Sequence, residues 1–136
     1  ITPQGWLFTM TRDEALDGFN SVHFLKHLLW HMESKLLVIW DGSTIHRNQC
    51  IKEFLSNSAA KQIHLERLPA YAPDLNPDKG VWNHLKYVEL KNVRCADLSN
   101  LRQKLHLAIR RLRGKPHLIQ SFFALAGLSI KKARYL

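Results

Sequence analysis

Residues 36–41 read LLVIWD, an apolar run that ends at an aspartate. The run is short and rich in β-branched and aromatic residues, which favours a strand that is buried on both faces. A helix is expected from Arg47 to Leu55, and residues 63–67, IHLER, fit a second short strand. This order predicts a β-α-β unit in which Asp41 lies at the carboxyl end of the first strand.

Upstream of this unit, the sequence predicts a hairpin and a helix. Residues 1–10, ITPQGWLFTM, fit the end of one strand, a Pro-Gln-Gly turn and a second strand from Trp6 to Met10. A helix is expected from Asp17 to Met32, because apolar residues recur there at a spacing of about 3.6 residues. Its predicted buried face contains Ser21, Val22, Leu25, Leu28, Leu29 and Met32.

Three histidines repeat every four residues on the other side of this helix: His23, His27 and His31. Imidazoles at this spacing can in principle hold a metal ion. Because no acid or cysteine completes a ligand set, we favour a solvent-exposed face without a metal.

Downstream, a proline-rich loop leads into three predicted helices. The loop, residues 68–77, reads LPAYAPDLNP. Asn76 can cap and Pro77 can open a helix that continues to about Val88. Asp97 begins an amphipathic helix that ends at Gly114, and a last helix is expected near residues 117–126. The apolar stripe of the amphipathic helix consists of Leu98, Leu101, Leu105, Ala108, Ile109 and Leu112.

The charge is unevenly distributed along the chain. The length of 136 residues, 46% of them hydrophobic, predicts one ordinary domain. The formal charge of +9 predicts an anionic partner such as nucleic acid. Residues 91–136 contain eleven Lys and Arg against a single acid, whereas residues 1–90 are nearly neutral. The excess positive charge therefore lies in the last third.

The location of the protein is predicted from its cysteines and apolar runs. Cys50 and Cys95 match no metal-ligand spacing, which favours a reducing compartment: the cytoplasm, or the nucleoid in a bacterium. No apolar run reaches the roughly 18 residues of a membrane span, and the N-terminus lacks the pattern of a signal peptide. The opening at Ile1 is typical of a segment cut from a longer protein.

Two stretches are more specific than general α/β patterning: WDGSTIHRNQ, residues 40–49, and LPAYAPDLNPDKGVWNHLK, residues 68–86. Together they resemble the mariner-type transposases and their bacterial insertion-sequence relatives, in the DDE superfamily of ribonuclease-H-like nucleases. That pattern has an Asp at a strand tip, a His a few positions later, and a Tyr-Ser/Ala-Pro-Asp/Glu-Leu-Asn-Pro loop before a helix with an acid and a Trp. In this chain the matching positions are Asp41, His46, residues 71–77 and Trp82.

The resemblance implies a metal-dependent endonuclease whose three acids hold Mg²⁺ or Mn²⁺. Asp41 matches the second acid and is the expected metal ligand. The first acid would lie upstream of Ile1, and the third position falls on Lys79. Asp78 is a weak substitute, because one residue along a helix it points about 100° away.

Several of these residues also have ordinary structural interpretations. Asp41 can be an acid of a strand-end turn, and His46 is either a group that supports the site or a loop residue. Trp82 and Tyr71 are expected to serve packing more than DNA stacking.

The implied fold is α/β: a ribonuclease-H-like mixed sheet with flanking helices that lacks its first core strand. We expect a partial catalytic domain over residues 1–90, and basic helices over residues 91–136 that pack on the same domain. DNA is the implied partner, and the intact protein is expected to form a homodimer.

The basic helices allow two interpretations. They can mimic a helix-turn-helix reader, or they can present a phosphate patch that does not read sequence. We favour the patch, because the last helix, LIQSFFALAGL in residues 118–128, is too apolar to read bases. The expected DNA contacts are Arg102, Arg110, Arg113, Lys115, Lys131 and Lys132.

The sequence thus predicts the catalytic-domain fragment of a DDE transposase, which cleaves and joins DNA at element ends. Lys79 and the missing first acid predict that this chain is inactive alone. Two alternatives stay open: a non-catalytic DNA-binding module, and a non-functional remnant of a decayed insertion element.

Overall fold

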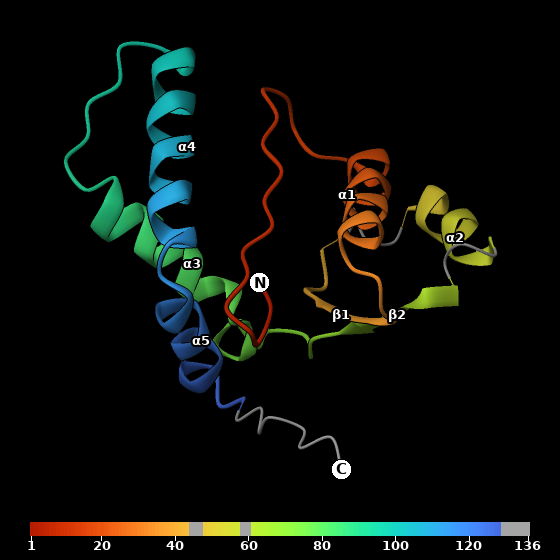
Figure 1. Ribbon diagram of the computed structural model, residues 1–136. Coiled ribbons are helices and arrows are strands. Elements are labelled where there is room, and N and C mark those ends of the chain that lie inside the picture. Colours follow the sequence, from red (N-terminus) through yellow and green to blue (C-terminus); the bar gives the residue numbers. More distant parts are fainter. Residues whose placement is uncertain (44–47, 58–60, 129–136) are drawn as a thin grey trace. The chain divides into compact units, whose positions relative to one another are not determined.

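The computed structural model describes residues 1–43, 48–57 and 61–128, whose helices and strands are labelled in Figure 1. These residues form two compact units. Residues 9–72 make up the first, termed the sheet unit, and residues 1–8 together with the chain from Pro73 onward make up the second, termed the helical unit. The predicted domains, 1–90 and 91–136, cross these units, and that division stays a prediction.

The sheet unit contains the predicted β-α-β arrangement. Strand β1 (Leu36–Trp40) pairs in parallel with β2 (Ile63–Arg67), and helix α2 (Gln49–Ser56) lies between them in the sequence. The register aligns Trp40 with Arg67, so both strands end at the same edge of the sheet. Asn48 begins α2, since its side chain accepts the backbone N–H of Cys50 at 3.1 Å.

Helix α1 (Gly18–His31) covers one face of this sheet, as the apolar spacing predicts. Asp17 caps it by accepting the N–H of Asn20 at 2.9 Å. Leu25 and Phe54 bury their side chains against Ile63. The histidines at positions 23, 27 and 31 are exposed, which confirms the expected solvent-facing side of the helix.

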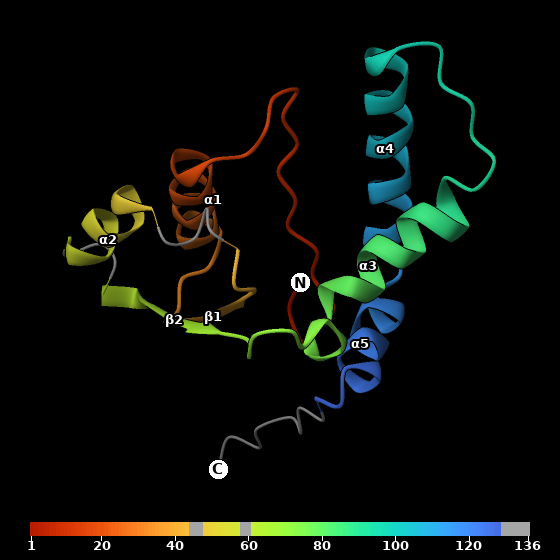
Figure 2. The ribbon, with the colours of Figure 1, turned by 180° about the vertical axis from the view of Figure 1, so that it is seen from behind.

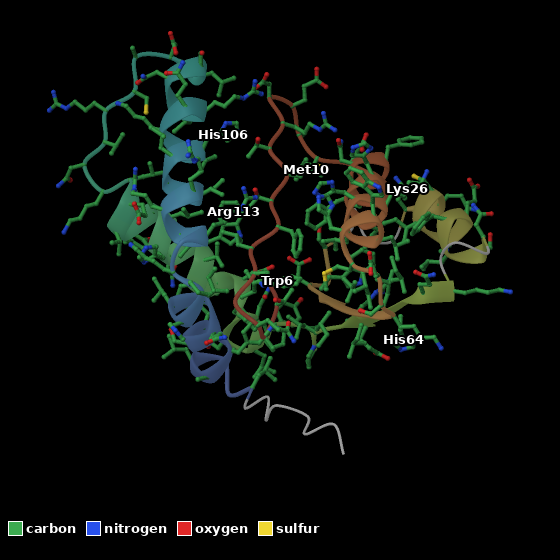
Figure 3. All side chains as sticks on the ribbon, in the orientation of Figure 1. Trp6, Met10, Lys26, His64, His106 and Arg113 are labelled. Carbon is green, nitrogen blue, oxygen red and sulfur yellow. The ribbon has the colours of Figure 1, made fainter. Side chains whose placement is uncertain are left out.

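The prediction that β1 is buried on both faces is wrong. Exposure alternates along the strand: Val38 packs on the core, whereas Leu37 and Ile39 are 62% and 51% exposed. His64, opposite Leu37 in the register, also lies on the open face, away from α1 and α2 (Figure 3). The reason is that α1 and α2 both contribute to the core on the other face.

The predicted hairpin over residues 1–10 is also wrong. The turn forms, because Gly5 donates its N–H to the Thr2 carbonyl at 2.9 Å, and Thr2 donates to the Trp6 carbonyl at 3.0 Å. Residues 6–10, all of which the structure describes, do not form the expected strand. An isolated two-stranded ribbon is marginal in water, and Leu7 is instead buried among helices. The sheet of the described residues is therefore a parallel pair and not the expected mixed sheet.

After residues 1–8, the chain returns to the helical unit at a short 3₁₀ turn, η3 (Pro73–Leu75). It continues into α3 (Asp78–His84) and the π-helical segment η4 (Leu85–Glu89). As predicted, the Asn76 side chain binds the start of α3, where it accepts the backbone N–H of Asp78 at 3.0 Å. The helix itself begins at Asp78, one residue later than the predicted Pro77, which is the cap residue. Helices α4 (Leu98–Arg113) and α5 (Pro116–Leu125) follow. Asp97 caps α4 through the N–H of Asn100 at 2.7 Å, also as predicted.

Helix α3 packs against α5, and α4 packs against α5 and η4, as Figure 2 shows from behind. The apolar stripe of α4 is buried only in its second half. In the first half, Leu98 and Leu101 are 58% and 41% exposed. Among the described residues, none of the helices combines the length and apolar character that crossing a bilayer requires. The shared core of the unit consists of Leu7, Val81, Leu85, Ala108, Ile109, Leu112, Ile119 and Phe122.

The contact between α3 and α5 leaves no room for a side chain at Gly80. A Cβ there would clash with the ring of Phe122 and stand 2.9 Å from its Cβ. We expect Gly80→Ala to lower the free energy of unfolding by about 1–3 kcal/mol, measured by urea denaturation. Gly114→Ala is the matched control, since its Cβ would lie 3.4 Å from the nearest atom, and its effect should stay within about 0.5 kcal/mol. Equal effects of the two variants would contradict this packing.

Candidate functional site

Asp41 directly follows β1, where the sequence predicts it. Its side chain is exposed, and Oδ1 accepts the backbone N–H of Ser43 at 3.0 Å, which makes an Asx turn. Next to it, the Trp40 carbonyl accepts the N–H of Leu68 at 2.9 Å. The end of β1 is thereby joined to the first residue of the proline-rich loop. His46 lies outside the described residues.

Lys79 lies in the first turn of α3, at the position where the resemblance implies the third acid. Its ammonium Nζ donates to Oδ1 of Asp74, a residue of the preceding 3₁₀ turn. Lys79 is half exposed and Asp74 is largely exposed, at 49% and 84% of their side chains. The start of α3 therefore presents a cation that is paired with an acid of the loop.

Asp78, the weak substitute for the third acid, has a structural role at the start of α3. Its side chain is 54% exposed, and its Oδ1 lies 3.5 Å from the Ile1 nitrogen. An acid in the first turn also interacts favourably with the helix dipole. Asp41 belongs to the sheet unit, whereas Asp78 and Lys79 belong to the helical unit.

The strand-tip acid and the proline-rich loop carry the resemblance that the sequence suggests, and both lie within the stretch that a family model matches. A family model described as DDE superfamily endonuclease matches residues 1–102, three quarters of the chain. The chain belongs to this family. Searches of curated proteins and of solved structures returned no match.

DDE endonucleases act on DNA and generally depend on divalent metal ions. A chain that binds such ions needs several oxygen-donating side chains close together. Within the described ranges, no three His, Cys, Asp or Glu side chains form a group that could hold a metal ion. Asp41 supplies a single carboxylate, and the position of the third acid supplies an ammonium. Hard cations require oxygen donors, so the donor set of the described residues does not fit a two-metal site.

A second polar cluster of the DDE chain surrounds Glu89, a residue that the sequence did not single out. Glu89 ends η4, and only 7% of its side chain is exposed. Its carboxylate accepts Arg111 Nε at 2.6 Å and Lys115 Nζ at 3.2 Å, and it lies 3.3 Å from His84 Nε2. The five-residue separation of His84 and Glu89 is the spacing of a π-helix, which the regular helical period did not reveal.

The surrounding cations stabilise the ionised form of Glu89. Its pKa falls from 4.5 to about 2, mainly because Arg111 donates a hydrogen bond to it. Burial opposes this shift, and the hydrogen bonds from Lys115 and His84 add to it. The cluster joins η4 to the C-terminal end of α4 and to the residue before α5.

The residues predicted to bind DNA have different surroundings. Arg110 is exposed, and Arg102 is partly buried. Arg113 donates from Nε to the Leu7 carbonyl at 3.0 Å, and Figure 3 shows it extending from α4. Lys115 binds Glu89. Lys131 and Lys132 lie outside the described residues.

Trp82 and Tyr71, two aromatic residues of the stretch from 68 to 86, do not pack in the interior as the sequence analysis expected. Trp82 is 67% exposed on α3, and Tyr71 is fully exposed in the loop with a φ of 59°. Val81, the neighbour of Trp82, enters the core instead. The helix is thus rotated so that its tryptophan faces outward.

The low pKa of Glu89 predicts a specific loss of stability in acid. A group whose pKa is lower in the folded state stabilises the fold fully above about pH 4.5, and this contribution disappears as the pH falls toward 2. We expect Glu89→Gln to cost about 1–2 kcal/mol of unfolding free energy near neutral pH and to cost less at about pH 3, in urea denaturation. The exposed Glu53→Gln variant is the control. A cost that does not change with pH would contradict the prediction.

Proposed function

We propose that this chain is the ribonuclease-H-like catalytic portion of a transposase of the mariner or insertion-sequence type, with DNA as its substrate. Membership of the DDE family supports this proposal. So does the parallel β-α-β unit, in which Asp41 follows the first strand and the proline-rich loop follows the second.

We further propose that the chain is catalytically impaired, and the pairing of Lys79 with Asp74 is the observation that carries this proposal. Unit charges 4 Å apart interact by about 4 kcal/mol at an effective dielectric constant near 20. An ammonium at the third-acid position repels a divalent cation by a multiple of that amount, whereas a carboxylate would attract it. Its partner Asp74 holds the ammonium at the start of α3.

Divalent ions supply charge stabilisation during phosphodiester cleavage in two-metal enzymes. In this chain, Asp41 is the proposed ligand. Lys79, at the position of the third acid, adds a positive charge and provides no metal ligand. The proposed consequence is a domain that retains the family fold and lacks the family chemistry.

A nicking assay tests the proposed impairment. DNA that carries terminal inverted repeats is incubated with the chain and Mg²⁺ or Mn²⁺, and the products are resolved on a denaturing gel. We expect no metal-dependent nicking, because the third-acid position holds a cation. Metal-dependent nicking that disappears in Asp41→Asn would show that the chain is active and would refute the proposal.

A metal titration tests the role of Lys79 separately from activity. We expect Lys79→Glu to tighten Mn²⁺ binding by at least about tenfold, measured by calorimetry, because it replaces a repulsion with an oxygen donor. Lys79→Gln is the matched control: it removes the charge without adding a carboxylate, and its gain should be smaller. No difference among the three proteins would argue against a metal position at the start of α3.

A non-catalytic DNA-binding module is the second candidate, and the exposed Arg110 on α4 favours it. Such a module binds DNA with an affinity that falls steeply with salt and does not depend on Asp41. The two candidates are compatible, because an impaired catalytic domain can still bind DNA. A homodimer of the intact protein and a cytoplasmic or nucleoid location remain further proposals.

A further inference from the structure

The cluster around Glu89 combines one largely covered carboxylate with two long cationic side chains that reach the surface. Glu89 is 7% exposed, whereas the side chains of Arg111 and Lys115 are 51% and 48% exposed. Both cations bind the same carboxylate, one oxygen each. Two permanent positive charges against one negative charge leave this surface positive.

Each cation retains hydrogen-bonding capacity beyond its bond to Glu89. A guanidinium has five N–H donors, and Nε–H of Arg111 is the one that binds Glu89. The ammonium of Lys115 has three donors, and its bond to Oε1 uses one. Half of each side chain is exposed, so the clamp proposed below requires that one anion reach the remaining donors of both groups while the bonds to Glu89 persist.

We propose that Arg111 and Lys115 form a clamp for one phosphodiester group of the DNA backbone, with Glu89 as its positioning residue. The inference rests on the proposed function, which supplies DNA as the partner. It adds a specific site, since Arg111 and Glu89 were not among the residues that the sequence assigned to DNA.

The physical basis of the clamp is preorganisation. Long cationic side chains lose rotational freedom when they bind, which weakens most surface phosphate contacts. Here a buried carboxylate already restricts Arg111 and Lys115, so less freedom is lost when a phosphate arrives. The planar fork of a guanidinium also matches the geometry of phosphate oxygens.

Arg110 offers a matched comparison, because it is an exposed arginine next to Arg111 in the same helix. A diffuse positive surface makes the two arginines equivalent, since each contributes one charge. A clamp makes them unequal. The difference between two single variants therefore separates the proposal from general electrostatic attraction.

The test measures binding of a short fluorescent duplex by anisotropy, over a series of salt concentrations. We expect Arg111→Ala and Lys115→Ala each to weaken binding about tenfold and to lower the salt slope by about one, and Arg110→Ala to weaken it about twofold. Arg111→Lys keeps the charge and loses the fork, so it should also weaken binding. Equal effects of Arg110→Ala and Arg111→Ala would overturn the clamp.

Glu89→Gln provides the sharpest contrast, because the two explanations predict opposite signs. Removal of a negative charge strengthens DNA binding if only charge matters, whereas loss of the positioning carboxylate weakens it, and we expect weakening of about threefold or more. Glu53→Gln removes the same charge from the sheet unit and is the control. Circular dichroism verifies that each variant is folded, and the comparison of the two arginines tests the clamp even if Glu89→Gln unfolds.

The outcomes also separate this inference from the proposed function. If the wild-type chain binds DNA and the two arginines are equivalent, the clamp fails and the DNA partner stands. If the wild-type chain binds no DNA even at low salt, both the DNA partner and the clamp are refuted.

Discussion

Parallel pairing of β1 with β2 requires a crossover connection, and this requirement organises the part of the chain that holds Asp41. The crossover runs through α2, so both strands point the same way and end at one edge. Asp41 leaves that edge from one strand and the proline-rich loop leaves it from the other, joined by the hydrogen bond between Trp40 and Leu68. The aspartate at the end of β1 and the start of the proline-rich loop are thus neighbours because of strand direction.

The charges at the start of α3 do not suit a divalent metal ion, although the family generally depends on such ions. Asp41 occupies the strand tip, but the helix that follows the loop carries Lys79 in its first turn, paired to Asp74. Elsewhere in the helical unit, hydrogen bonds from Arg111 and Lys115 lower the pKa of Glu89 to about 2. Acidic groups in the helical unit therefore hold basic side chains in place, and in our proposal they prepare those side chains for a phosphate.

Local signals in the sequence predicted the helix boundaries well, because capping depends on a side chain and its nearest backbone. Asp97 caps α4 as expected, α1 begins within one residue of its predicted start at Asp17, and α3 begins one residue after the predicted Pro77. Expectations that needed a partner from a distant segment were less reliable. The hairpin over residues 1–10 requires a neighbouring strand, and burial of Leu37 and Ile39 requires a second layer.

The sequence by itself determined the β-α-β order, the capped helices, the strand-end position of Asp41 and the cation at position 79, since all of these follow from residues close together in the chain. Only the tertiary structure decided that Glu89 is an ion-paired carboxylate, because Arg111 and Lys115 reach it from more than twenty residues away. It also decided that Trp82 faces outward and that Gly80 contacts Phe122. Burial and ion pairing depend on which distant surfaces meet, and a local pattern does not contain that information.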